Sequence, residues 1–215
     1  VMPYEAVLRL HASSYLPEAG YPRQADRLFR QLESFAAPGQ LPRIHLDYGR
    51  FLRQQGRSGA ARRAFENARK GAADALARSP GRLPSLEVVA FACDELGDPE
   101  GRDRAGRAAI DVLTARLARL DAGGDTEESG AVLWSQAAAN RELRARTLIR
   151  RARLHLLLED CAAAIQDQAD AASIVEWADT ARALDKLGRD AGAACPGGAT
   201  GEPGRIAPGV RRPES

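Results

Sequence analysis

The sequence predicts an all-helical fold built from antiparallel helix pairs. The chain has 215 residues, of which 44% are hydrophobic and only 5% aromatic, and alanine is abundant. That composition suits helices better than strands, which favour β-branched and aromatic residues. Apolar residues also recur with the period of a helix rather than the period of a strand. Because short helices with one apolar face cannot bury that face alone, the pairs are expected to stack on one another.

Proline and glycine mark the helix boundaries expected in the first half of the chain. The segment 41–55 carries an apolar stripe at helical spacing, so one of its faces requires a neighbour. The segment after Gly56 has a similar stripe, and 86–120 is expected to form another helix pair around Gly97. The stripes consist of Ile44, Tyr48, Phe51 and Leu52, and then of Ala61, Ala64, Phe65, Ala68 and Ala72.

The second half carries fewer boundary signals. Residues 123–130 are polar and rich in turn formers, so a loop is expected there, with Thr126 or Ser129 capping the next helix. Residues 131–187 contain no glycine or proline. Since an average helix has ~11–12 residues, this region must contain unmarked turns or one very long helix.

The composition changes after Gly192, where glycine and proline become frequent and large apolar residues rare. The sequence therefore predicts a helical domain over 1–191 and a disordered tail over 192–215. Deleting residues 193–215 is expected to leave the stability of the domain nearly unchanged.

An internal repeat is the most informative motif. Its best copy contains His45, Tyr48, Gly49, Leu52, Gly56, Ala61, Phe65 and Ala68. This pattern resembles a tetratricopeptide repeat (TPR). By that resemblance Gly49 and Ala61 lie where the paired helices approach most closely. Gly56 is expected in the turn, and Phe65 is expected to pack against the next repeat.

Weaker copies occur on both sides of this repeat. Gly20, Ala25 and Phe29 match Gly56, Ala61 and Phe65 at a distance of 36 residues, with Ser13 at the position of the helix glycine. Another copy over 148–171 aligns on Ala152, Ala164 and Ala171 and predicts a turn at Glu159-Asp160-Cys161. The resemblance implies a right-handed superhelix, an α-solenoid, with a concave groove that binds a peptide or protein. It implies no catalytic residues.

Motifs for catalysis and cofactor binding are absent from the sequence. It has no phosphate-binding loop and no dinucleotide fingerprint. His11, His45 and His155 are too scattered for a metal cluster and are expected to be partly buried. Asp98 is expected to cap a helix rather than to bind a cation. We therefore predict neither an enzyme nor a bound cofactor or metal.

The cysteines suggest a reducing compartment. Cys93, Cys161 and Cys195 form an odd set without C-x-x-C spacing, so neither a disulfide framework nor a thiolate zinc site is expected. Cys93 is expected in the core, because neighbouring carboxylates disfavour its thiolate. No apolar run reaches the ~20 residues of a membrane span. These observations favour a cytoplasmic location and no membrane partner.

Arginine accounts for 29 of the 31 basic residues. A GC-rich genome would give the same excess, but arginine also binds carboxylates in a bidentate manner. Aligning the two repeats places Arg43 on Arg146 and Arg50 on Arg153, in one stripe on each first helix. In the family that the chain resembles, this side lines the groove. The residues expected to bind an acidic segment of a partner are Arg43, Arg50, Arg146, Arg150 and Arg153.

Two alternatives accompany this expectation. The arginines could be solvated surface, with Asp47 pairing with Arg43 and Arg50 on the same helix. The chain could also be a ligand-sensing or regulatory domain of a larger signalling or transcription protein, rather than a protein-binding scaffold. Nucleic acid is not favoured as a partner, because the net charge is only +2 and stacking aromatics are scarce.

Overall fold

The structure is a computed structural model that describes residues 8, 12, 16–18, 20–122, 133–175 and 178–195. Within these ranges every regular element is helical and no strand occurs, which confirms the predicted all-helical class. The helices are α2 (Leu16–Glu18), α3 (Pro22–Phe35), α4 (Leu41–Gln54), α5 (Ser58–Arg78), α6 (Leu83–Leu96), α7 (Pro99–Asp121), α8 (Leu133–Leu157), α9 (Cys161–Ala172) and α10 (Ala178–Ala194).

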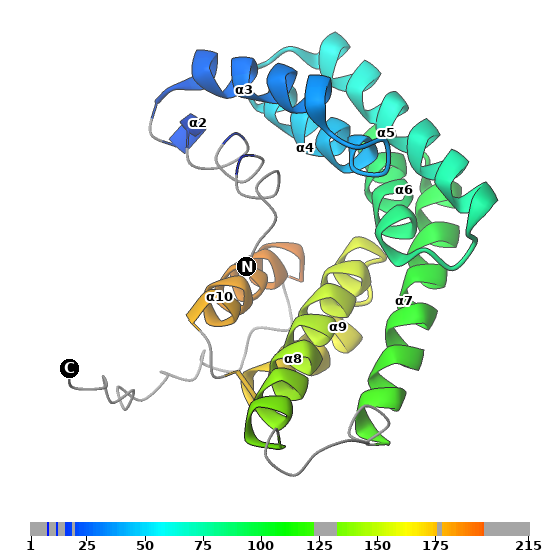
Figure 1. Ribbon diagram of the computed structural model, residues 1–215, viewed down its shortest axis with the longest axis vertical. Coiled ribbons are helices and arrows are strands. Elements are labelled where there is room, and N and C mark those ends of the chain that lie inside the picture. Colours follow the sequence, from blue (N-terminus) through cyan, green and yellow to red (C-terminus); the bar gives the residue numbers. More distant parts are fainter. Residues whose placement is uncertain are drawn as a thin grey trace.

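Helices that follow one another in sequence pack against one another. The closest partners are α4 with α5, α6 with α7, and α8 with α9, while α5 on α6 and α7 on α8 join one pair to the next. Figure 1 shows the resulting curved array, with α4, α6 and α8 on its inner side and α5 and α7 on its outer side. The last helix, α10, packs against α8 and α9. This arrangement fits a helical repeat.

The same turn occurs at four places in the described part of the chain. In each turn one residue has a positive φ, between 63° and 82°, and the next helix begins two residues later. The N–H of the residue with positive φ donates to the carbonyl of the residue three positions before it. The N–H of the next residue donates to the carbonyl of the residue five positions before that one. These are the two hydrogen bonds of a Schellman motif, which ends a helix with a left-handed residue. The four residues are Gly20, Gly56, Gly97 and Glu159.

The turn at Glu159 confirms the boundary that the alignment of repeats predicted. Helix α8 ends at Leu157 and α9 begins at Cys161. Asp160 accepts a hydrogen bond from the Ala163 N–H at 3.2 Å and so caps α9. Glu159 is the only non-glycine residue with positive φ in the part of the chain that the structure describes.

Replacing Glu159 with glycine is expected to raise the free energy of unfolding by about 1 kcal/mol, because a left-handed conformation costs a residue with a Cβ about that much. Urea unfolding measures the change. Glu159→Ala is the matched control, since it keeps the Cβ and removes only the carboxylate that lies 3.5 Å from Arg102. If alanine stabilised the chain as much as glycine, the gain would come from the lost carboxylate and not from the backbone.

The core consists of three apolar clusters that follow one another along the array. One apolar cluster joins α3, α4, α5 and α6, a second joins α6, α7 and α8, and a third joins α7 to α10. Helices α4 and α5 approach closely at Gly49, as predicted, but the side chain that Gly49 meets is Phe65 and not Ala61: a Cβ added at Gly49 would lie 2.5 Å from the Phe65 ring. Ala61 and Phe65 are both buried, and Phe65 belongs to the cluster that includes Val88 and Ala92 of α6.

The helical structure extends beyond the boundary predicted at residue 191. Helix α10 continues through Gly192 to Ala194, and Cys195 is buried. The disorder predicted for the rest of the tail concerns residues 196–215, which lie outside the described residues. The same holds for the predicted caps Thr126 and Ser129 and for Ser13.

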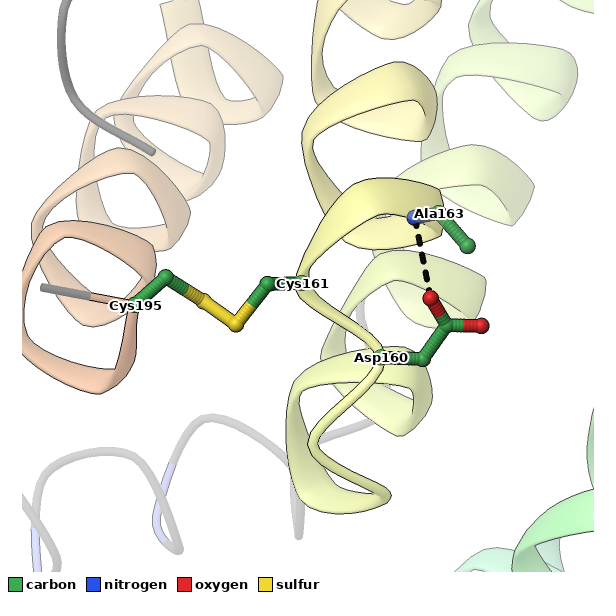
Figure 2. Close-up of a disulfide and its surroundings, with 4 residues drawn as sticks. All are labelled: Asp160, Cys161, Ala163 and Cys195. Carbon is green, nitrogen blue, oxygen red and sulfur yellow. Dashed lines mark hydrogen bonds between the residues drawn. A yellow bond between two sulfur atoms is a disulfide. The ribbon is translucent and has the colours of Figure 1, made fainter. Parts of the chain in front are cut away.

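Cys161 and Cys195 form a disulfide, with their Cα atoms 5.9 Å apart. Figure 2 shows how this bond joins the start of α9 to the end of α10, next to the cap that Asp160 forms. The expectation that the cysteines form no disulfide is therefore wrong for this pair. The odd number of cysteines arises because Cys93 is free and buried. Because disulfides persist mainly in oxidising compartments, the cysteines no longer favour a reducing compartment.

Candidate functional site

The five predicted arginines lie on two inner helices, with α6 between them. Arg43 and Arg50 belong to α4, and the other three belong to α8. Arg153 lies close enough to Arg43 and Arg150, and to Glu87 of α6, for their charges to act on its guanidinium. Arg50 and Arg146 have separate partners, so the five residues do not form one uniform patch.

Arg50 links α4 to α6. Its Nε donates to Glu95 Oε1 at 3.0 Å, and Arg53 also donates to the Glu95 carboxylate. The Arg50 guanidinium lies 5.0 Å from the centre of the Phe91 ring, in cation–π geometry. Because the Glu95 side chain is only 5% exposed, its carboxylate requires these arginines. Arg50 therefore has a structural role between two helix pairs.

Arg150 links α8 to α6 in the same way. Its Nε and Nη2 donate to the two oxygens of Glu87 at 2.8 and 2.6 Å, a bidentate pair. Sequence reasoning missed both Glu87 and Glu95 as partners. The sequence did contain a signal for Glu87, because this glutamate interrupts an apolar stretch of α6. A charged residue in such a stretch is expected to be buried with a partner, and Glu87 is buried.

Arg43 and Arg146 pair within their own helices. Arg43 Nε lies 3.4 Å from Asp47, as the alternative interpretation expected, and Arg50 pairs with Glu95. Arg146 Nε donates to Glu142 at 2.5 Å, and the Thr180 hydroxyl of α10 donates to the same carboxylate. The positive charge of each of these two arginines is thus partly balanced by a carboxylate of its own helix.

Arg153 differs from the other four. It is half-buried, and burial lowers the pKa of its guanidinium. Asp190 of α10 and Glu87 raise that pKa, while Arg43 and Arg150 lower it. None of the hydrogen bonds and ion pairs among the described residues involves the Arg153 side chain. Arg153 is therefore a partly desolvated cation, and the carboxylates of Asp190 and Glu87 act on it only from beyond ion-pair distance.

Cys93 lacks the environment of a nucleophile. It is buried, and burial together with the nearby Asp98 carboxylate raises the pKa of its thiol. Asp98 instead accepts a hydrogen bond from the Gly101 N–H at 2.9 Å and caps α7, as predicted. The core assignment of Cys93 and the capping assignment of Asp98 are both confirmed.

The described residues contain no group of three or more histidine, cysteine or acidic side chains that could hold a metal ion. None of their helices is long and apolar enough to cross a membrane. No family model, no curated protein and no solved structure matches this chain.

Proposed function

We propose that the chain is a non-catalytic scaffold of the TPR-like type, an α-solenoid whose inner helices bind an acidic segment of a partner protein. The four equivalent turns and the stacking of consecutive helix pairs support this architecture. In the family that the sequence resembles, the first helix of each pair lines the groove. The corresponding helices here are α4, α6 and α8, which carry all five predicted arginines.

The observation that carries the proposal is the state of Arg153. A half-buried guanidinium has lost part of its hydration, and no carboxylate of the described chain lies close enough to replace that hydration directly. An incoming carboxylate would supply charge-assisted hydrogen bonds, which are stronger than neutral ones. The other arginines already pair with carboxylates, so Arg153 is the anchor and the others add positive potential around it.

A random-peptide display selection against the intact chain tests the proposal. Selected peptides are expected to be enriched in aspartate and glutamate, and fluorescence anisotropy then measures their affinity for variants. Arg153→Gln is expected to weaken binding about 10-fold or more, since hydrogen bonds to charged groups contribute ~1.5–3 kcal/mol. Arg153→Glu should weaken it further, and binding to the wild type should fall as salt rises, because salt screens these charges.

Arg63→Glu is the matched control, because Arg63 is an exposed arginine of the outer helix α5. Reversing Arg50 is less informative, since a glutamate there would face the buried Glu95 and threaten the fold. The proposal fails if selection yields no acidic sequences. It also fails if the selected peptides bind Arg153→Glu as tightly as they bind the wild type, while circular dichroism shows an intact fold.

A further inference from the structure

We infer that the outer side of the array contains a second binding site, a groove between α5 and α7 for a free single-chain carboxylate. Such a ligand has an elongated apolar body and one anionic head. The groove is independent of the arginines on the inner side, and the inference goes beyond the proposed protein-binding function.

The groove has the size and lining of a small-molecule site. Its volume is about 720 Å³, within the ~300–1,000 Å³ range that is usual for such sites. Helices α5 and α7 form its walls, and α6 forms its floor. The apolar lining consists of Ala73, Leu76, Leu86, Val89, Ala105 and Ala108.

The floor lies on the opposite side of α6 from the predicted protein-binding surface. Leu86 and Val89 line the groove. Glu87 bonds to Arg150, and Phe91 lies under Arg50. With about 100° between successive residues of a helix, these two sets point in nearly opposite directions. A ligand in the groove and a peptide on the inner side would therefore not compete for the same surface.

Positive charge is concentrated at one end of the groove. Arg69 and Lys70 of α5 and Arg104 of α7 line that end, and all three are exposed. Asp98 lies 3.4 Å from Arg69, and its charge also acts on Arg104, but these side chains are exposed and such pairs contribute little. The acidic lining residue Glu66 already accepts a hydrogen bond from Arg62 at 3.1 Å. The end of the groove is thus able to accept an anion.

The order of the lining residues favours a ligand with a single head. Along α5 the charged pair Arg69 and Lys70 precedes Ala73 and Leu76, and along α7 Arg104 precedes Ala105 and Ala108. The contact between Arg69 and Asp98, the N-cap of α7, brings the two charged ends together. An acidic helix would carry charges along its length and would require cations along the whole groove. One carboxylate followed by an apolar chain matches the observed order.

Isothermal titration with dodecanoate, below the concentration at which it forms micelles, tests the inference. We expect saturable binding at one site and much weaker binding of dodecanol, which lacks the charge. Lys70→Gln and Arg104→Gln are each expected to weaken dodecanoate binding about fivefold. Ala73→Phe should abolish it, because the added ring fills the groove from an exposed position.

Arg63→Gln removes an exposed charge from α5 outside the groove and should leave the affinity unchanged. Arg153→Glu should also leave the dodecanoate affinity unchanged. The test of peptide binding at Arg153 and the test of carboxylate binding in the groove can therefore fail independently. Absence of saturable dodecanoate binding overturns the inference. So does equal affinity for dodecanol, or full affinity in Ala73→Phe. If that variant does not fold, unchanged affinity in the Lys70→Gln, Arg104→Gln double variant has the same consequence.

Discussion

Replacing Phe65 with alanine is expected to lower the free energy of unfolding by about 3–5 kcal/mol. Phe65 is only 2% exposed and belongs to the largest apolar cluster, which joins four helices. The Gly49 backbone of α4 lies directly against its ring. Truncation would therefore leave a cavity between α4, α5 and α6, and the paired helices cannot collapse freely to fill it. Chemical unfolding measures the loss.

Phe35→Ala is the matched control for this change. Phe35 is at the end of α3 and is 52% exposed, so the same truncation should cost less than about 1 kcal/mol there. A second test uses the contact itself. Gly49→Ala should destabilise the wild type, because the new Cβ would meet the ring, but should be tolerated once Phe65 is alanine. If Phe65→Ala and Phe35→Ala cost the same, the repeat has been placed incorrectly.

The helix boundaries were predictable wherever the chain uses glycine or proline to end a helix. Gly56 and Gly97 both occupy the left-handed position that their sequence context suggests. The turn at Glu159 has no such residue, and only its alignment with the earlier repeat revealed it. That glutamate adopts a positive φ could not be predicted, because the surrounding helices impose the conformation.

The candidate site was predictable in its placement but not in its pairing. Aligning the repeats assigned Arg43 and Arg50 to one first helix and Arg146 and Arg153 to another, and these helices are α4 and α8. The partners Glu87 and Glu95 lie 63 and 45 residues away from Arg150 and Arg50, so only the packing of α6 between α4 and α8 brings them together. Whether an arginine pairs with a carboxylate, as Arg150 does, or has no ion pair among the described residues, as is the case for Arg153, likewise depends on how the helices pack.

Removing the disulfide, by replacing both Cys161 and Cys195 with serine, is expected to lower the free energy of unfolding by about 2–4 kcal/mol. The bond joins residues separated by 34 positions, and closing such a loop restricts the unfolded chain. Reducing agent should lower the thermal midpoint of the wild type towards that of the double variant. The double variant itself should not respond. A Cys93→Ala control should keep the response, because Cys93 is free.

The same bond changes what is expected of the C-terminal residues. Composition alone predicts that residues 193–215 are dispensable, but their removal takes Cys195 away and leaves Cys161 without its partner. Truncation after residue 192 should therefore lower the thermal midpoint under oxidising conditions. Truncation after residue 197 should not, because it keeps the cysteine and the end of α10. Under reducing conditions the two truncated chains should become similar, since α10 is then held mainly by apolar contacts such as those of Leu184 and Leu187. If they have equal midpoints under oxidising conditions as well, the disulfide does not contribute to the stability of the chain.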